Sequence, residues 1–314
     1  MTRVLVTGGA GFIGRWVVKA LLDEGRRVVV LDDFSNGSRT NIAEFANDAR
    51  LDVVEASIDD PHAVERAFTD DVEVCLHLAA KINVQHSIDD PVGTYRPDVI
   101  GTLLLLERAR VTRTRFLFMS SCMVYAPAGD EAIDEQHPVR PASPYAASKL
   151  AGESLALSYA YAYALPAAVV RPFNTYGPYQ RADGEGGVVA IFCQRALAGE
   201  TIDVFGDGTQ TRDLLYVADC AEFVLRAAAS PAAVGQVLNA GTGRDIRIRD
   251  LAELVGRDRV GWRLAPHPHP QAEIARLVCD PRRAEDVLGW RAATDLAGGI
   301  ARTTEWLAVS GGTA

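Results

Sequence analysis

The sequence VLVTGGAGFIG, residues 4–14, decides the fold of this chain. It joins a short apolar run to a helical pattern through three glycines, Gly8, Gly11 and Gly14. Glycines at this spacing allow a tight turn and let the backbone approach a pyrophosphate group. An acidic residue, Asp32, ends the next apolar run about twenty residues further on, where a dinucleotide-binding unit holds the adenosine ribose. The stretch therefore predicts a strand, a glycine turn and a helix that together bind a dinucleotide.

The predicted cofactor is NAD rather than NADP. The carboxylate of Asp32 can accept hydrogen bonds from the ribose, and its negative charge would repel a 2′-phosphate. The helix that follows the glycine turn offers free backbone amides and a positive dipole end to the phosphates.

Short apolar runs alternate with longer helical patterns through the first half of the chain. We expect helices near residues 12–24, 61–69, 98–110 and 145–164. The alternation, with right-handed crossovers, predicts an α/β, Rossmann-type doubly wound parallel sheet. Strands are expected at Val4–Thr7, Val28–Leu31, Val53–Glu55, Val74–Leu78, Phe116–Ser120 and Ala168–Arg171.

The pattern changes after Pro172, where glycine and proline become frequent and the elements shorten. Two later runs, Leu215–Val217 and Val237–Asn239, are predicted to rejoin the sheet. We therefore expect an NAD-binding Rossmann domain over residues 1–172 and 214–243. A smaller C-terminal α/β lobe for the substrate is expected over residues 173–213 and 244–314.

Composition excludes several classes of function. The net charge of −9, without clusters of lysine and arginine, argues against a nucleic-acid surface. No signal-peptide pattern and no apolar run of about 18 residues is present, so we expect no membrane span. The five cysteines are scattered without metal-like spacing, which predicts reduced thiols, no metal site and a cytoplasmic protein.

The predicted catalytic residues begin with Tyr145 and Lys149, one helical turn apart in the sequence PYAASK. A phenol has an ordinary pKa of about 10, too high for a base at neutral pH. A nearby ammonium and a positive nicotinamide ring would both favour the phenolate. Ser121 follows a predicted strand at the carboxyl edge of the sheet, where ligands bind, and its hydroxyl is expected to bridge Tyr145 and a substrate hydroxyl.

Two distal runs, RPFNTYGP at residues 171–178 and GDGTQTRD at residues 206–213, complete a pattern that spans nearly the whole chain. With them the chain resembles the extended short-chain dehydrogenases/reductases of the nucleotide-sugar epimerase/dehydratase family, and most of all UDP-hexose 4-epimerases. The resemblance implies an NAD-binding Rossmann domain, a lobe that binds a nucleotide-diphosphate sugar, and a homodimer joined through a helix bundle.

The resemblance also implies binding residues. Asn174 would contact the substrate, Arg212 would pair with its diphosphate, and His269 and Glu273 would stand in for further diphosphate and ribose contacts. The implied cofactor contacts are Gly8, Gly11, Phe12, Ile13, Gly14, Asp32, Asp33, Asn36, Gly37, Ile58, Leu78, Ala79, Ala80, Tyr145, Lys149 and Phe173. The implied substrate contacts are Lys81, Ser121, Met123, Asn174, Val188, Val189, Phe205, Arg212, His269 and Glu273.

The residues beside Ser121 select among the family's reactions. Dehydratases of the family have two carboxyl groups in this loop, which remove the C5 proton and protonate the leaving C6 hydroxyl. This chain has Cys122 and Met123 there. The loop therefore favours epimerisation at C4 of a UDP-hexose, a UDP-N-acetylhexosamine or a UDP-hexuronate, through a transient 4-keto sugar.

Two alternatives stay open from the sequence. Cys122, taken as a fourth catalytic residue, would carry a proton if its thiolate were stabilised, and the enzyme would then be a dehydratase or a C5-acting epimerase. Its other interpretation is a small buried hydrophobic residue. The second alternative is an NAD-binding sensor without turnover, against which the presence of both Tyr145 and Lys149 argues.

Overall fold

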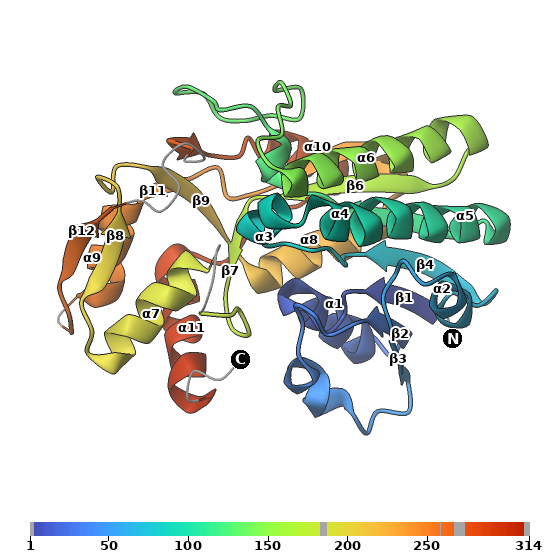
Figure 1. The fold of residues 1–314 in the computed structure, drawn as a ribbon, viewed down its shortest axis with the longest axis horizontal. Coiled ribbons are helices and arrows are strands. Elements are labelled where there is room, and N and C mark those ends of the chain that lie inside the picture. The colour runs from blue at the N-terminus through green and yellow to red at the C-terminus, as the bar shows by residue number, and fades with distance from the viewer. Residues whose placement is uncertain (1–2, 183–186, 258, 267–273, 311–314) are drawn as a thin grey trace.

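The computed structural model describes residues 3–182, 187–257, 259–266 and 274–310. Within these ranges the largest feature is an all-parallel sheet of seven strands in the order β3-β2-β1-β4-β5-β6-β10, with helices on both faces (Figure 1). The predicted Rossmann-type fold is confirmed. The strands are β1 (Arg3–Thr7), β2 (Arg27–Asp32), β3 (Leu51–Glu55), β4 (Val72–His77), β5 (Arg115–Met119), β6 (Ala167–Pro172) and β10 (Val237–Ala240).

The two faces of the sheet carry separate apolar cores. Because side chains alternate along a strand, Val4 and Val6 enter the core under α1 and α8, whereas Leu5 enters the core under α2, α5 and α6. Strands covered on both faces are apolar on both, as the sequence indicated. The covering helices are α1 (Phe12–Asp23), α8 (Val217–Ala229) and α10 (Arg282–Leu288) on one face, and α2 (Pro61–Ala67), α5 (Thr102–Thr112) and α6 (Pro144–Tyr163) on the other.

The strand order reverses between β1 and β4, which fixes where a ligand binds. Thr7, the last residue of β1, lies opposite Leu31 of β2 and His77 of β4. Ligands of open α/β sheets bind outside the carboxyl ends of the strands at such a reversal. The glycine turn after β1 and the residues after β4 therefore border the candidate site.

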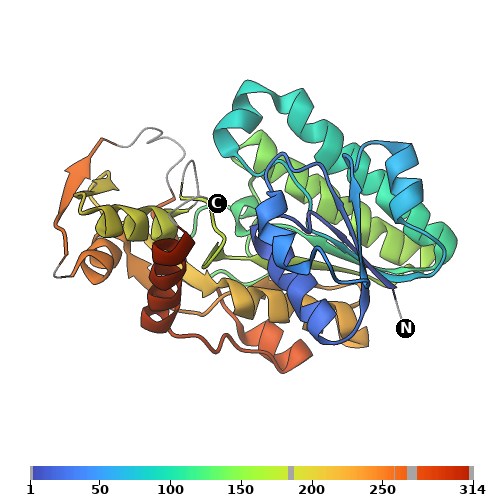
Figure 2. The same ribbon diagram turned by 90° about the horizontal axis from the view of Figure 1, so that it is seen from below.

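A smaller lobe lies beside the carboxyl edge of the sheet (Figures 1 and 2). Its central strand β9 (Thr211–Tyr216) pairs with β7 (Asn174–Tyr176), β11 (Asp245–Arg247) and β13 (Arg276–Leu277). A second small sheet joins β8 (Ile202–Phe205) to β12 (Trp262–Ala265). The lobe's helices are α7 (Val188–Ala198), α9 (Ile248–Gly256) and α11 (Leu296–Ser310).

One of the two strands predicted to rejoin the large sheet does not do so. The run Leu215–Val217 ends β9 and begins α8, and β9 pairs only within the small lobe. Leu214 and Tyr216 pack into the lobe's core, whereas Leu215 packs into the core beneath α1 and α8. The strand is apolar on both faces because it separates two cores. The other strand, Val237–Ala240, pairs with β6 in parallel.

The helical region between β4 and β5 is more broken than the sequence indicated. It consists of α3 (Val84–Asp89), α4 (Pro91–Tyr95), a π-helical turn η2 (Arg96–Gly101) and then α5. The remaining short helices are the 3₁₀ segments η1 (Arg39–Phe45), η3 (Cys122–Val124) and η4 (Pro231–Ala233). Among the described residues, every helix is too short or too polar to span a bilayer.

A buried ion pair ties α6 to β6. Arg171 donates from Nε and Nη2 to the two carboxylate oxygens of Glu153 over 2.7 and 2.5 Å, and both side chains are almost fully buried.

Breaking such a pair leaves an uncompensated charge in the interior. We expect Glu153→Gln to lower the free energy of unfolding by about 3 kcal/mol in a urea titration. The exposed pair of Glu222 with Arg226 provides the control, since Glu222→Gln should cost less than about 0.5 kcal/mol.

Candidate functional site

The glycine turn after β1 leaves backbone amides free for an anion. Gly8 has a φ of +70°, and a Cβ there would lie 2.7 Å from the backbone nitrogen of Ala79. A Cβ on Gly14 would collide with the carbonyl oxygen of Gly8. Gly11 caps the N-terminus of α1 without a side-chain hydrogen bond, so the amides of Phe12 and Ile13 have no partner within the helix. This cradle fits a diphosphate.

Asp32 ends β2 in the wall of a pocket next to this turn. Its carboxylate accepts hydrogen bonds from the amides of Ala10 (2.9 Å) and Phe34 (2.8 Å). Burial raises the pKa of this carboxyl group, and the two backbone hydrogen bonds lower it. A carboxylate offers about four acceptor positions, so capacity remains for ribose hydroxyls.

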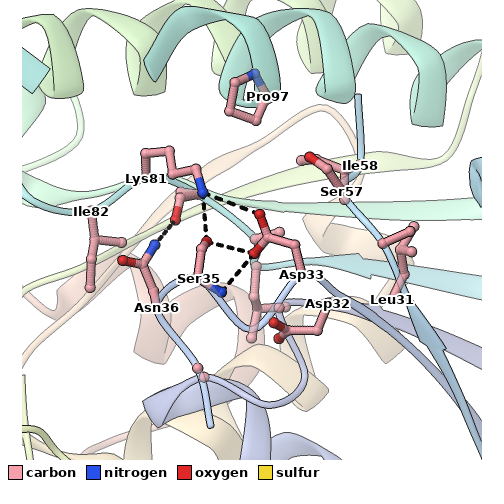
Figure 3. A pocket seen from close by; sticks show the side chains of 17 residues that line it. Leu31, Asp32, Asp33, Ser35, Asn36, Ser57, Ile58, Lys81, Ile82 and Pro97 are labelled. Carbon is pink, nitrogen blue, oxygen red and sulfur yellow. Dashed lines mark hydrogen bonds and ion pairs between the residues drawn. The ribbon is translucent and has the colours of Figure 1, made fainter. Parts of the chain in front are cut away.

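The pocket gathers most of the residues expected to contact the cofactor (Figure 3). Six further lining residues were not among the predicted contacts, because no motif marks them: Leu31, Ser35, Ala56, Ser57, Ile82 and Pro97. The predicted cofactor residues that line the pocket are Gly8, Gly11, Asp32, Asp33, Asn36, Gly37, Ile58, Leu78, Ala79 and Ala80.

Lys81, predicted to contact the substrate, also lines this pocket, among the predicted cofactor residues. Its ammonium group donates to Asp33 over 3.1 Å and to Ser35 over 2.6 Å (Figure 3). The ion pair with Asp33, 48 residues away, holds the side chain near the end of β2. Its contact with the substrate stays a prediction.

A chain of buried hydrogen bonds joins the ends of β1 and β4 to the π-helical turn. Thr102 donates to the carbonyl of Asp98 (2.5 Å) and so accepts from Nε2 of His77 (2.8 Å), which leaves Nδ1 to accept from Thr7 (2.7 Å). The amide of Ala79 donates to the Thr7 hydroxyl over 3.2 Å. Burial lowers the pKa of His77 to about 3, so the ring is neutral. These contacts fix the backbone beside Gly8.

Tyr145 and Ser121 meet, as expected, at the carboxyl edge of the sheet. A hydrogen bond from the Ser121 hydroxyl lowers the pKa of the Tyr145 phenol, but burial raises it more strongly and the charge of Asp98 adds to that rise. The net shift without the cofactor is upward. Lys149, one helical turn further along α6, is buried as well, and its ammonium donates to the carbonyl of Met119 over 3.0 Å.

Asp98 is the buried carboxylate beneath this site, and the sequence analysis missed it. It accepts hydrogen bonds from the Lys81 amide (2.8 Å) and the Ser148 hydroxyl (2.7 Å) and is 3% exposed. Burial raises its pKa, and the charge of Lys149 lowers it. An acidic residue within an apolar helical stretch was the available signal. The π-helical turn that positions it cannot be read from the sequence, although such turns often mark functional sites.

Cys122 lies in a second apolar cluster with Phe173 and Cys279. Burial raises the pKa of the Cys122 thiol to about 12, so the thiol stays protonated near neutral pH. The structure thus places Cys122 as a small buried apolar residue. Phe173, expected at the cofactor, packs in the same cluster and is 2% exposed. Met123 packs against its edge.

The other predicted substrate residues come from the small lobe. Oδ1 of Asn174, at the start of β7, is buried and has no hydrogen-bond partner among the residues that the structure describes. Arg212 lies on β9 close enough to Cys122 to act on its charge. Val188 begins α7, Val189 packs into the lobe's core, and Phe205 is exposed at the end of β8. His269 and Glu273 lie outside the described residues.

We expect Asp98→Asn to shift the pH profile of turnover to lower pH by roughly one unit. The amide oxygen can accept from the Lys81 amide, and the amide NH2 can donate to Ser148 while that hydroxyl donates to the carbonyl of Tyr145. The substitution therefore removes mainly the negative charge that raises the pKa of both Tyr145 and Lys149. The pH dependence of kcat/KM measures the shift, and Asp23→Asn on the exposed surface of α1 is the control. An unmoved profile with lowered activity would mean that Asp98 acts only by packing.

Comparisons with known proteins agree with this geometry. Residues 4–241 match the family model described as "NAD dependent epimerase/dehydratase family". The chain is 41% identical to a UDP-glucose 4-epimerase of Mycolicibacterium smegmatis, over 97% of this chain and 98% of that protein. It is 33% identical to a dTDP-glucose 4,6-dehydratase of Streptomyces niveus, over 97% of this chain and 92% of the relative.

Solved structures show the same fold. Pal from Bacillus thuringiensis superposes with a TM-score of 0.95 at 48% identity, covering 98% of this chain and all of that one. A UDP-glucose 4-epimerase of Thermus thermophilus in complex with NAD gives a TM-score of 0.88 at 34% identity, with 98% of this chain and 99% of that one covered.

Proposed function

This chain belongs to the NAD-dependent epimerase/dehydratase family as an enzyme of the isomerase class, and from that premise we propose that it inverts C4 of a UDP-linked sugar. The reaction passes through a 4-keto sugar that turns in the pocket before it is reduced on its other face. The cradle and pocket described above would hold NAD, which would supply the acceptor and then the donor of the C4 hydride. The protein's own groups then have to bind the sugar nucleotide and move one proton.

The observation that carries this proposal is the loop after β5, where Ser121 meets Tyr145 and the next two residues carry no charge. Two buried carboxylates act electrostatically on groups at this site, Asp98 on Tyr145 and Asp213 on Cys122, and both accept hydrogen bonds from the protein. Asp98 accepts from Lys81 and Ser148. Asp213 accepts from the amides of Thr242, Gly243 and Cys279. Neither is arranged as the second acid or base that an elimination requires.

Tyr145 is the base in this proposal. Burial raises the pKa of its phenol. Ionisation of the phenol in this proposal therefore depends on the positive charge of Lys149 and of the bound cofactor. Ser121 donates to the phenol oxygen and orients the C4 hydroxyl. Asn174 offers a free acceptor to the substrate, and Arg212 provides the charge for its diphosphate.

The proton-carrier role for Cys122 has less support. A thiol with a pKa near 12 is a poor acid and base at neutral pH. The relatives nevertheless include both epimerases and dehydratases. Solvent exchange at C5 is therefore the measurement that separates the two reactions.

The test is to incubate the purified protein with UDP-glucose, UDP-N-acetylglucosamine and UDP-glucuronate and to resolve products by NMR. We expect a C4 epimer from at least one of them, without net use of NAD and without solvent deuterium at C5. Tyr145→Phe should lower kcat by about 10²–10⁴-fold, because the base is removed. Cys122→Ala, which removes only the thiol, should keep kcat within a few-fold.

A 4-keto-6-deoxy sugar or a pentose among the products would overturn the assignment as an epimerase. Full activity in Tyr145→Phe would remove the proposed base. Loss of activity in Cys122→Ala, together with deuterium at C5, would favour the C5 chemistry.

We also propose that the enzyme is a homodimer. Large apolar side chains are exposed on the helices that cover one face of the sheet, and α4, α5 and α6 lie side by side there (Figure 1). Exposed apolar side chains on neighbouring helices are candidates for an interaction surface. Its members are Val92 on α4, Ile100 on η2, Val111 on α5, and Tyr161 and Tyr163 on α6.

Light scattering of the purified protein should give twice the mass of one chain. Val92→Arg, at a side chain 74% exposed in the described chain, should shift that mass toward the monomer because it buries a charge in the interface. Val309→Arg on α11, also highly exposed but away from this face, should leave the mass unchanged. A monomeric wild type would contradict the proposal.

The cytoplasm is the compartment we propose. All five cysteines lie in the described ranges, and each is buried and unpaired. Free thiols are typical of a reducing compartment. The proposed substrates are charged nucleotide sugars, which a cytoplasmic enzyme meets directly.

A further inference from the structure

Arg15 is a buried arginine on the cofactor helix that faces away from the cofactor pocket. It follows Gly14 on α1, is 2% exposed, and is absent from the pocket lining. Nε donates to the carbonyl of Asn41 over 3.0 Å, and the guanidinium pairs with Glu44. Its free face lies 3.8 Å from the ring centroid of Tyr179. A buried guanidinium on an aromatic face forms a strong cation–π contact.

Tyr179 belongs to the other lobe, in the segment that follows β7. Its φ is +71°, a left-handed conformation that a non-glycine residue keeps only where the surroundings hold it. Arg15 lies over its ring on the cofactor side. Trp306 of α11 lies on the lobe side, with ring centroids 4.9 Å apart. Trp16, next to Arg15, donates from Nε1 to the carbonyl of Pro178 over 3.2 Å. Two adjacent residues of α1, Arg15 and Trp16, therefore contact this segment.

A hydrogen bond connects the segment after β7 to the neighbour of a predicted substrate contact. Gln180 donates from its amide group to the carbonyl of Thr175 over 2.9 Å. Thr175 is the neighbour of Asn174, whose Oδ1 has no partner among the described residues. Movement of Tyr179 would therefore move the end of β7 that presents Asn174.

We propose that Arg15 is a positioning residue for the sugar nucleotide: stacked on Tyr179, it holds the segment after β7 against the cofactor helix and so sets the place of Asn174. The proposal rests on the proposed function for its substrate but not for its geometry. Arg15 does not line the cofactor pocket, and it reaches the other lobe through its stacked contact with Tyr179.

The kinetic test uses Arg15→Met, which keeps the length of the side chain and removes the guanidinium, and Tyr179→Leu, which removes the ring. We expect each to raise KM for the epimerised UDP-sugar about tenfold, equal to about 1.4 kcal/mol of binding free energy, with kcat within threefold. The double variant should cost no more than the worse single variant, because the two residues act through one contact. Tyr179→Phe, which keeps the ring, should have the wild-type KM.

The matched control is Arg302→Met. Arg302 is exposed on α11, and its guanidinium lies over the ring of another tyrosine, Tyr216. It should leave KM unchanged. NAD content after purification should equal the wild-type content in every variant. Additive effects in the double variant, or a loss of kcat and NAD without a rise in KM, would overturn the proposal in favour of a merely structural arginine.

Hydrogen–deuterium exchange tests the geometry without any turnover. Peptides spanning residues 176–182 should exchange at least several-fold faster in Arg15→Met and Tyr179→Leu than in the wild type, and at the wild-type rate in Arg302→Met. Unchanged exchange in both variants would overturn the proposal even if KM rose. If the wild type turned over no UDP-sugar, the proposed function would fail, and this measurement would still decide whether Arg15 holds the segment.

Discussion

Close packing of backbone against backbone at the glycine turn is the constraint on which the rest of the molecule depends. Gly8 lies against the backbone of Ala79, and Gly14 lies against Gly8, with no room for a Cβ at either. Helix α1 therefore starts directly behind β1, and its free amides reach the reversal point of the sheet. The same placement directs Arg15, the next residue, toward Tyr179 of the other lobe. One steric condition thus positions the cofactor cradle and the junction between the lobes.

Behind that turn, a chain of buried hydrogen bonds centred on His77 holds the catalytic end of the sheet. His77 joins Thr7 to Thr102, and Thr102 holds the carbonyl of Asp98. A neutral ring with a fixed tautomer makes each hydrogen bond of this chain directional. Buried networks that are fully satisfied rigidify a site. Here the network places one carboxylate beneath Tyr145 and binds it through Ser148 of the same helix.

Features with a local signal could be predicted from the sequence, and features made by distant partners could not. The glycine turn, the parallel strands and the approach of Ser121 to Tyr145 all follow from short motifs. The run Leu215–Val217 was misplaced because apolar residues on both faces of a strand do not say which two cores it separates. The ion pair of Lys81 could not be predicted because its partner, Asp33, lies 48 residues away. The roles of Asp98 and Arg15 likewise come from contacts across the fold.

The electrostatics of the site suit a reaction that exchanges one proton at one carbon. Burial raises the pKa of both Tyr145 and Cys122, so neither group is charged on its own near neutral pH. A phenol that ionises only when positive charge is added returns its proton readily once that charge is neutralised. An elimination would also need a second group beside the base, an acid that donates a proton to the leaving group. The carboxylates that act on Tyr145 and Cys122 are Asp98, which accepts from two donors, and Asp213, which accepts from three backbone amides. Among these described groups, Tyr145 is the one that the proposal uses both to take and to return a proton.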